Sequence, residues 1–278
     1  MYSLGPYRLD LISDGFFEDD ADTFVRECAE KQHPPGLKVR SKPRIRVGFN
    51  GLLVRGNGRT VVIDPGTGDK PRHDLVRLYR MEWPRRFMSS LGGLGVSPND
   101  VDTVILTHLH WDHCGAGTRA SDNGTIVPTF PNARYFAHRQ ELDAARSGAE
   151  GYISDDFEPL LKTGHLEVFE QDGEIIPDFE IRWTGGHSAG HSIVIIGTPP
   201  HPQAVFLSDL VPTSAQLPLE CGLSYDVNPV ELRRAKERIL KEAAAGQYLL
   251  MFVHAPKVRA GLISETDRTR YKLESISI

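Results

Sequence analysis

The chain has 278 residues, of which 40% are hydrophobic and 25% are charged, and its formal net charge at pH 7 is −5. These values are ordinary for a soluble globular protein with a large core. The acidic balance offers no basic footprint for nucleic acid, and no apolar run approaches the roughly 20 residues of a membrane span. We therefore expect neither nucleic acid nor a membrane as a partner.

The N-terminus and the cysteines favour a cytoplasmic location. Residues 1–8 lack the positive segment followed by an apolar run that is typical of a signal peptide. The three cysteines, Cys28, Cys114 and Cys221, are widely spaced and form no CxxC motif. This spacing argues against a disulfide framework and suits a reducing compartment.

The first quarter of the chain predicts three strands. Residues 7–13 have the pattern of a strand, and residues 44–55 and 59–64 are two further runs joined by a Gly-Asn-Gly hairpin signal. Asp64 ends the third run within a cluster of turn-forming residues. We favour a turn-forming role for Asp64, with a carboxylate that supports a metal ligand as the alternative.

A long segment, residues 14–44, separates the first two of these strands. Within it, residues 20–31 carry apolar side chains at helical spacing. The segment is too long for a plain connection, so we expect a lid over a site or an arm that contacts another subunit of a homodimer. A surface excursion with neither role is an equal alternative.

The middle of the chain predicts short elements joined by loops. An amphipathic stretch covers residues 75–88, and a flexible glycine-rich loop is expected at residues 91–95. Residues 118–132 are loop-like, and a strand over 133–137 and a helix over 139–147 follow.

The rest of the chain predicts a helix over residues 229–245 and four strands, at residues 180–183, 193–196, 204–207 and 249–253. The sequence contains no internal repeat and no low-complexity tract. A single domain over residues 1–278 is expected.

The most informative stretch is residues 101–113. It begins as a β-branched apolar run, typical of a buried strand, and ends in His108, His110, Asp112 and His113. Packing alone does not require three histidines and an aspartate within six residues. This cluster predicts a metal site at the end of a strand.

Three more apolar runs end in a residue able to bind metal: residues 181–184 precede His187, residues 204–208 precede Asp209, and residues 249–253 precede His254. Strand ends gather at one edge of a sheet flanked by helices, and sites form there. Alone, a histidine at a strand end is more often a hydrogen-bonded core or surface residue. The cluster makes the ligand interpretation the better one.

The spacing suits two metal ions side by side. In an extended segment His108 and His110 face the same way, and Asp112 and His113 follow as the chain turns. One site would use His108, His110 and His187, the other would use Asp112, His113 and His254, and Asp209 would bridge them. Imidazole and carboxylate ligands without thiolate fit Zn²⁺, and also Mn²⁺, Fe²⁺ or Co²⁺.

These motifs resemble those of the metallo-β-lactamase superfamily. The stretch Thr107-His108-Leu109-His110-Trp111-Asp112-His113 is similar to its THxHxDH motif, and Gly186-His187-Ser188-Ala189-Gly190-His191 is similar to its GHTPGH segment. The resemblance covers about residues 40 to 258. It implies a four-layer αβ/βα sandwich of two mixed sheets with outer helices, and it makes His187 the ligand, with His191 in a supporting role.

Within the superfamily the layout is similar to the branch of quorum-quenching lactonases and methyl parathion hydrolase. One residue departs from the lactonase pattern. Those lactonases carry a tyrosine just after the bridging aspartate, as a donor to the substrate carbonyl, whereas Leu210 follows Asp209 here. Tyr225 is the nearest tyrosine after it.

The expected activity is hydrolysis of a small molecule, a lactone or an ester. Two metals about 3.5–4 Å apart can share a hydroxide that attacks a carbonyl at neutral pH. Asp112 and Asp209 are the catalytic candidates, with Asp112 passing on a proton and Asp209 holding the metals together. Phosphotriester hydrolysis is the alternative. A mono-iron enzyme similar to the persulfide dioxygenases and a binding protein with a structural metal are further possibilities.

Overall fold

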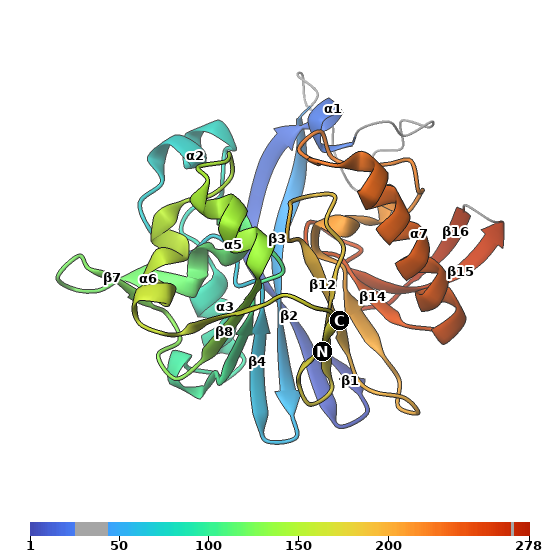
Figure 1. The fold of residues 1–278 in the computed structure, drawn as a ribbon, viewed down its shortest axis with the longest axis horizontal. Coiled ribbons are helices and arrows are strands. Elements are labelled where there is room, and N and C mark those ends of the chain that lie inside the picture. The colour runs from blue at the N-terminus through green and yellow to red at the C-terminus, as the bar shows by residue number, and fades with distance from the viewer. Residues whose placement is uncertain (26–43, 268–269) are drawn as a thin grey trace.

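The computed structural model describes residues 1–25, 44–267 and 270–278, and its main feature is a pair of seven-stranded sheets packed face to face (Figure 1). The first sheet has the order β1-β2-β3-β4-β5-β8-β9, and the second has the order β10-β11-β12-β13-β14-β15-β16. A small third sheet pairs β6 with β7.

The first sheet consists of β1 (Tyr2–Leu4), β2 (Tyr7–Asp20), β3 (Arg44–Gly56), β4 (Arg59–Ile63), β5 (Thr103–Ile105), β8 (Arg134–His138) and β9 (Leu166–Phe169). The second consists of β10 (Gly173–Ile176), β11 (Phe179–Trp183), β12 (Ser192–Ile196), β13 (Ala204–Phe206), β14 (Leu249–Met251), β15 (Ala260–Asp267) and β16 (Arg270–Ser275). The small sheet contains β6 (Thr118–Ala120) and β7 (Ile126–Pro128).

The helices are α1 (Ala21–Phe24), α2 (His73–Leu78), α3 (Phe87–Gly93), α4 (Trp111–Cys114), α5 (Arg139–Arg146), α6 (Glu158–Lys162) and α7 (Pro229–Gly246). Figure 1 shows α3, α5 and α6 on the outside of the first sheet and α7 on the outside of the second. This arrangement confirms the predicted four-layer αβ/βα sandwich.

Three hydrophobic clusters hold these layers together. The cluster between the sheets joins residues of both, such as Leu52 and Val61 with Val194 and Phe206. Alternate residues of a strand face opposite sides, so the other faces of the same strands pack against helices. A second cluster lies under α3, α5 and α6, and a third lies under α7.

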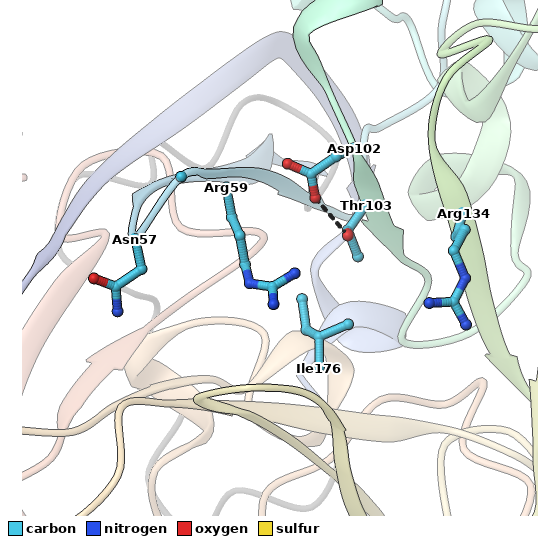
Figure 2. A pocket seen from close by; sticks show the side chains of 7 residues that line it. Asn57, Arg59, Asp102, Thr103, Arg134 and Ile176 are labelled. Atoms are coloured by element: carbon cyan, nitrogen blue, oxygen red, sulfur yellow. Dashed lines mark hydrogen bonds between the residues drawn. The ribbon is translucent and has the colours of Figure 1, made fainter.

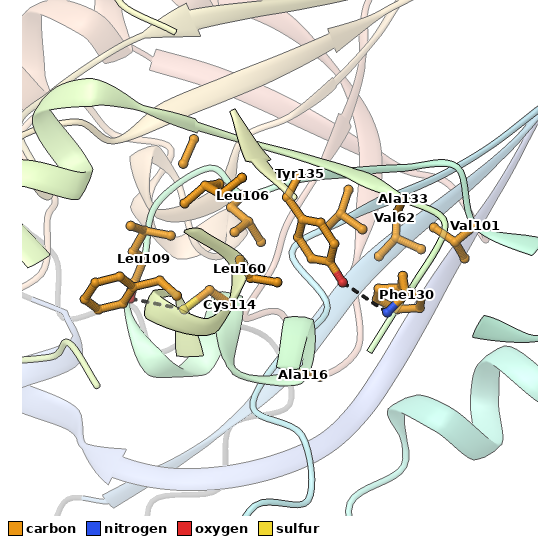
Figure 3. Packing of buried hydrophobic residues seen from close by; sticks show 14 of the residues in the cluster. Val62, Val101, Leu106, Leu109, Cys114, Ala116, Phe130, Ala133, Tyr135 and Leu160 are labelled. Carbon is orange, nitrogen blue, oxygen red and sulfur yellow. Dashed lines mark hydrogen bonds between the residues drawn. The ribbon is translucent and has the colours of Figure 1, made fainter. Parts of the chain in front are cut away.

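Cys114 belongs to the cluster under α3, α5 and α6 (Figure 3). It is fully buried, and its thiol donates to the carbonyl of Leu109. In the same cluster Tyr135 donates its hydroxyl to Gly117 O at 2.9 Å and accepts from Phe130 N at 3.1 Å. These bonds satisfy the polar atoms of a core that lies directly behind α4.

Strand direction determines where the site forms. β4, β5 and β8 are parallel neighbours, and β13 and β14 are parallel neighbours. β12 runs antiparallel to both β11 and β13, so β11 has the direction of β13. The ends of β4, β5, β11, β13 and β14 therefore meet at one end of the sandwich, which we call the ligand end.

Several predicted boundaries are wrong. β2 continues past Ser13 to Asp20 through a bulge between Ser13 and Gly15, and the loop expected at residues 91–95 is largely helix α3. Phe87 and Leu91 lie one helical turn apart and are buried, so tertiary packing outweighs the low helix propensity of the glycines. The loop-like residues 118–132 contain the β6–β7 hairpin, and β10, β15 and β16 were not predicted.

Two further expectations concern the segment at residues 14–44 and the cysteines. Of the expected lid or arm and its helix, only the end of β2 and α1 fall in the described part, since residues 26–43 lie outside it. Cys221 is disulfide-bonded, contrary to the prediction from cysteine spacing. Within the described ranges no helix is long and apolar enough to cross a membrane.

Replacement of Phe179 by alanine tests the core between the sheets. Phe179 is fully buried in β11, and its ring packs edge-on against Tyr7 at 5.6 Å. We expect Phe179→Ala to lower the free energy of unfolding by about 3–5 kcal/mol, because a buried cavity replaces the ring. Guanidinium unfolding at matched metal content measures this. Val230→Ala, at a residue that is 62% exposed, is the control and should change stability by less than about 0.5 kcal/mol.

Candidate metal centre

The seven predicted ligands come together at the ligand end. His108 and His110 follow β5, and Asp112 and His113 lie in α4. Of the other three, His187 lies in the loop between β11 and β12, Asp209 lies in the turn Ser208–Leu210 after β13, and His254 follows β14. An isolated β-bridge between His110 and Tyr152 fixes the backbone where the chain enters α4.

The ligands form two groups of three. One atom from each of His108, His110 and His187 lies within 4.8 Å of the others, and the same is true of Asp112, His113 and His254. These are the two sets that the spacing of the motifs predicted. We refer to them as the first and second ligand groups.

The Asp209 carboxylate lies between the two groups. Its Oδ2 is 3.1 Å from Nε2 of His187 in the first group and 3.3 Å from Nε2 of His113 in the second. Its Oδ1 is 3.2 Å from Nε2 of His254. A single carboxylate therefore reaches ligand atoms of both groups, as a bridging ligand would.

Unpaired polar atoms point to what the centre holds. His108 Nε2, His113 Nε2 and Asp209 Oδ1 are buried, and although the Asp209 carboxylate lies 3.2 Å from His254 and 3.3 Å from His113, none of these three atoms forms a well-aligned hydrogen bond among the described residues. Leaving such atoms unsatisfied costs about 1–3 kcal/mol each, so three at one place call for a ligand. A divalent cation fits, because imidazole nitrogens and carboxylate oxygens are its ordinary donors.

The outer nitrogens of the histidines are held by acceptors. His113 Nδ1 donates to Asp64 at 2.9 Å, His187 Nδ1 donates to Asp226 at 3.0 Å, and His254 Nδ1 donates to the carbonyl of Gly48 at 2.8 Å. Each bond places the proton on Nδ1 and leaves Nε2 free to bind a metal.

Asp64 supports this end of the fold as well as its turn. Its carboxylate accepts from the backbone N–H of Thr107 at 2.9 Å, from the Thr107 hydroxyl at 2.6 Å and from the Ser208 hydroxyl at 3.1 Å. With the bond from His113, it joins three segments that lead to ligands. The backbone of Asp64 has φ +47°, typical of a tight turn. The structure thus supports the alternative interpretation of Asp64 alongside the favoured one.

His191, the second histidine of the glycine-rich segment, lies behind Asp209. It is fully buried, and its Nε2 accepts from the backbone N–H of Asp209 at 3.1 Å while its Nδ1 donates to the Thr184 hydroxyl at 2.6 Å. Burial lowers the pKa of His191 well below its ordinary value, which keeps the ring neutral and able to accept. These contacts are those of a supporting residue.

Two buried carboxylates were missed by the sequence interpretation. Asp226 holds His187, as described above, and also accepts from the backbone N–H of Leu223. Glu141 in α5 accepts four hydrogen bonds from segments next to the first ligand group. No local motif predicts the role of either residue, because the ligand segments that they hold, at His187 and at Leu109, lie 39 and 32 residues away.

Tyr225 lies at the surface near the centre. It is 40% exposed, and its hydroxyl donates to the Asp19 carboxylate. Burial and the neighbouring Asp19 charge raise the pKa of Tyr225, so the phenol stays protonated at neutral pH.

In the metal-free centre, burial and the neighbouring carboxylates shift the pKa values of the histidines in different directions. Burial lowers the pKa of His108 well below its ordinary value. Burial acts the same way on His113 but is outweighed by the Asp209 and Asp112 carboxylates, which raise its pKa well above the ordinary value. Burial also disfavours charge on His187, yet Asp209 and Asp226 raise its pKa.

A second concavity lies at the opposite end of the sandwich, where β4, β5 and β8 begin (Figure 2). It has a volume of about 450 Å³ and is lined by Asn57, Gly58, Arg59, Asp102, Thr103, Arg134 and Ile176. Arg134 forms two hydrogen bonds of 2.6 Å with Glu167, and Asp102 accepts from Thr60 N and the Thr103 hydroxyl. Much of its polar lining is thus already paired within the protein, unlike the metal centre.

Comparison with known proteins agrees with this geometry. The model of the Metallo-beta-lactamase superfamily matches residues 48–254, well over half of the chain, from within β3 to His254. The chain belongs to the metallo-beta-lactamase superfamily. The resemblance inferred from the motifs is therefore confirmed.

Relatives within the superfamily include lactonases. An N-acyl homoserine lactonase of Bacillus cereus is 28% identical over 168 residues, which cover 59% of this chain and 62% of that protein. N-acyl homoserine lactonase AiiB of Agrobacterium fabrum is 28% identical over 188 residues, covering 63% of this chain and 64% of that protein. Each match thus spans less than two thirds of the relative.

Solved structures share the fold over the whole chain. A probable metal-dependent hydrolase from Staphylococcus aureus has a TM-score of 0.87 at 21% identity, with 100% of both chains covered. The dizinc quorum-quenching lactonase AidC has a TM-score of 0.74 at 18% identity, covering 100% of this chain and 97% of that one. At these identities the likeness establishes the fold alone.

Metal binding should release protons. In the metal-free protein the pKa of His113 is raised well above its ordinary value and that of His187 is raised as well, which favours the protonated imidazoles, whereas a metal ligand must be neutral. Affinity should therefore rise with pH and level off once both imidazoles are neutral. Calorimetric titration of Zn²⁺ at pH 7 in buffers of different ionisation enthalpy should give at least one proton released per protein. Release of none would contradict the assignment.

Proposed function

We propose that this protein is a metal-dependent hydrolase that opens a lactone or ester with two divalent metal ions, with zinc as the first candidate. His108, His110 and His187 would hold one ion, Asp112, His113 and His254 would hold the other, and Asp209 would bridge them. The observation that carries the proposal is the position of the Asp209 carboxylate, 3.1 Å from His187 in the first group and 3.2 Å from His254 in the second.

Two ions in such a pair supply a nucleophilic hydroxide at neutral pH and polarise the substrate oxygen. The chain's own part is to orient its ligands and to move a proton. Asp112 suits the proton transfer, because its side chain is 15% exposed whereas that of Asp209 is 5% exposed. Its Oδ2 lies 3.6 Å from Nε2 of both His113 and His254. Asp112 can thus take a proton at the centre and return it to solvent.

The named activity of the relatives favours a lactone or ester over other substrates. N-acyl homoserine lactonases match 59% to 63% of this chain at 28% identity. A phosphotriester is the second candidate, because Leu210 follows Asp209 and the Tyr225 hydroxyl is engaged by Asp19. A mono-iron enzyme would leave the second ligand group without a role, and this disfavours it.

We also propose that residues 1–278 act as one domain, since the cluster between the sheets includes Leu4 near one terminus and Ala260 near the other. A homodimer and a cytoplasmic location stay predictions. The cytoplasmic location was inferred partly from cysteine spacing, and the disulfide at Cys221 argues against that inference.

The role of Asp209 can be tested by replacement with alanine. Loss of this carboxylate should lower kcat/KM by at least about 10²-fold. It should also lower the metal content below two ions per chain. His191→Ala is the contrasting variant, because its side chain only supports the backbone of Asp209, and most of the metal should stay bound. Full activity of Asp209→Ala would exclude the mechanism.

A substrate panel on metal-quantified protein tests the function itself. γ-Lactones and aryl esters should be hydrolysed, with activity lost on chelation and restored by Zn²⁺. Faster hydrolysis of a paraoxon-type triester would favour the second candidate. Two ions per chain support the two-metal centre, whereas a single iron would overturn it. A β-lactam serves as the negative comparison.

A further inference from the structure

Glu141, in the first turn of α5, is the buried carboxylate that joins the chain segments of the first ligand group. Its exposed fraction is 0%. One oxygen, Oε1, accepts from the backbone N–H of Leu109 at 3.0 Å and from the Tyr152 hydroxyl at 2.8 Å. The other oxygen, Oε2, accepts from the Ser188 hydroxyl at 2.7 Å and from the backbone N–H of Gly190 at 2.9 Å.

The two oxygens divide their bonds between two ligand segments. Leu109 lies between His108 and His110, and Tyr152 forms the β-bridge with His110. Ser188 and Gly190 belong to the loop that carries His187. All three histidines of the first group are therefore held, through their backbone, by one side chain from a third part of the chain.

Glu141 packs directly against the loop that carries His187, so a shift of Glu141 would move that loop. A Cβ added to Gly190 would lie 2.3 Å from the backbone nitrogen of Glu141, so the loop and the start of α5 are in direct contact. Trp183 Nε1 donates to the carbonyl of Ala189 in the same loop at 2.9 Å. The loop has little room to move without breaking bonds to Glu141.

The negative charge of Glu141 would also favour a cation in the first ligand group. Its four hydrogen-bond donors are neutral, so no cation in these bonds offsets the buried carboxylate. The first ligand group contains three imidazoles and no carboxylate of its own, whereas the second contains Asp112. A cation bound by the first group would face a buried negative charge behind its ligands, which favours binding.

We propose that Glu141 is a positioning residue of the first metal site, which clamps the His108–His110 and His187 segments together and strengthens metal binding there but not at the second group. The proposal rests on the two-metal function described above. Glu141 is not a member of either ligand group. It acts through the backbone of the ligand segments and through its charge.

Glu141→Gln is the central variant. It keeps the shape of the side chain, but it removes the charge and turns an NH₂ group toward donors that need an acceptor. We expect the dissociation constant of one Zn²⁺ to rise by about 10–100-fold while that of the other changes by less than about threefold. Competition with a chromophoric chelator, with metal analysis, measures both constants. Glu167→Gln, on the surface strand β9, is the matched control and should leave both unchanged.

Combined variants assign the loss to one group. Removing His254 should leave the first group as the only tight site, and adding Glu141→Gln should then remove its metal. Removing His110 should leave the second group, and adding Glu141→Gln should then cost no more than about threefold. Equal losses in both backgrounds would indicate a general structural effect and overturn the proposal.

Two milder variants cover the case in which Glu141→Gln does not fold. Tyr152→Phe and Ser188→Ala each remove one hydroxyl donor and keep the carboxylate. Each should weaken the same Zn²⁺ by a few-fold, with wild-type circular dichroism and thermal unfolding of the metal-free protein. Wild-type affinity in both variants and in Glu141→Gln would overturn the proposal.

The experiments distinguish failure of the proposal for Glu141 from failure of the proposed hydrolase function. If the wild-type protein binds two ions but hydrolyses none of the panel, the proposed function fails and the affinity measurements still test Glu141. If it hydrolyses lactones with two ions bound and Glu141→Gln binds both normally, only the clamp fails.

Discussion

The burial of metal-binding side chains at the ligand end is the constraint on which the rest of the structure depends. His108, His113 and His187 are nearly inaccessible to solvent, and the Nε2 atoms of His108 and His113 form no well-aligned hydrogen bond among the described residues. Such burial destabilises a fold unless the atoms gain a ligand. A site of this kind is therefore maintained by the surrounding sheets and by the ions it would bind, because metal binding to the folded state adds to its stability.

The fold meets this constraint with a layer of carboxylates behind the histidines. Asp64 holds His113, Asp226 holds His187, and Glu141 holds the segments around them. Each carboxylate accepts from backbone N–H groups as well as from side chains, and those of Asp64 and Asp226 also hold an imidazole ring. The side chains of the proposed ligands are thereby held in place by the protein itself, which would lower the entropic cost of binding a metal.

Features that depend on a local sequence pattern were easier to predict than those that depend on packing between distant segments. The ligands of residues 108–113 were predicted because they are close in sequence and polar where a strand pattern calls for apolar residues. The hairpin before Asp64 and helix α7 were predicted for the same local reason. The glycine-rich end of α3 was predicted wrongly, since burial of Phe87 and Leu91 against the first sheet outweighs the intrinsic preference of glycine.

From the sequence, local motifs predicted seven metal ligands, and their resemblance to a known superfamily implied the sandwich fold, which the structure confirms. The packing of the whole fold was needed to show that one oxygen of Asp209 faces His187 and the other faces His254, and that Glu141 joins the two segments of the first group. The physical reason is distance along the chain. Asp226 lies 39 residues from His187, and Glu141 lies 32 residues from Leu109, so only the packing of the strands and α5 brings them together.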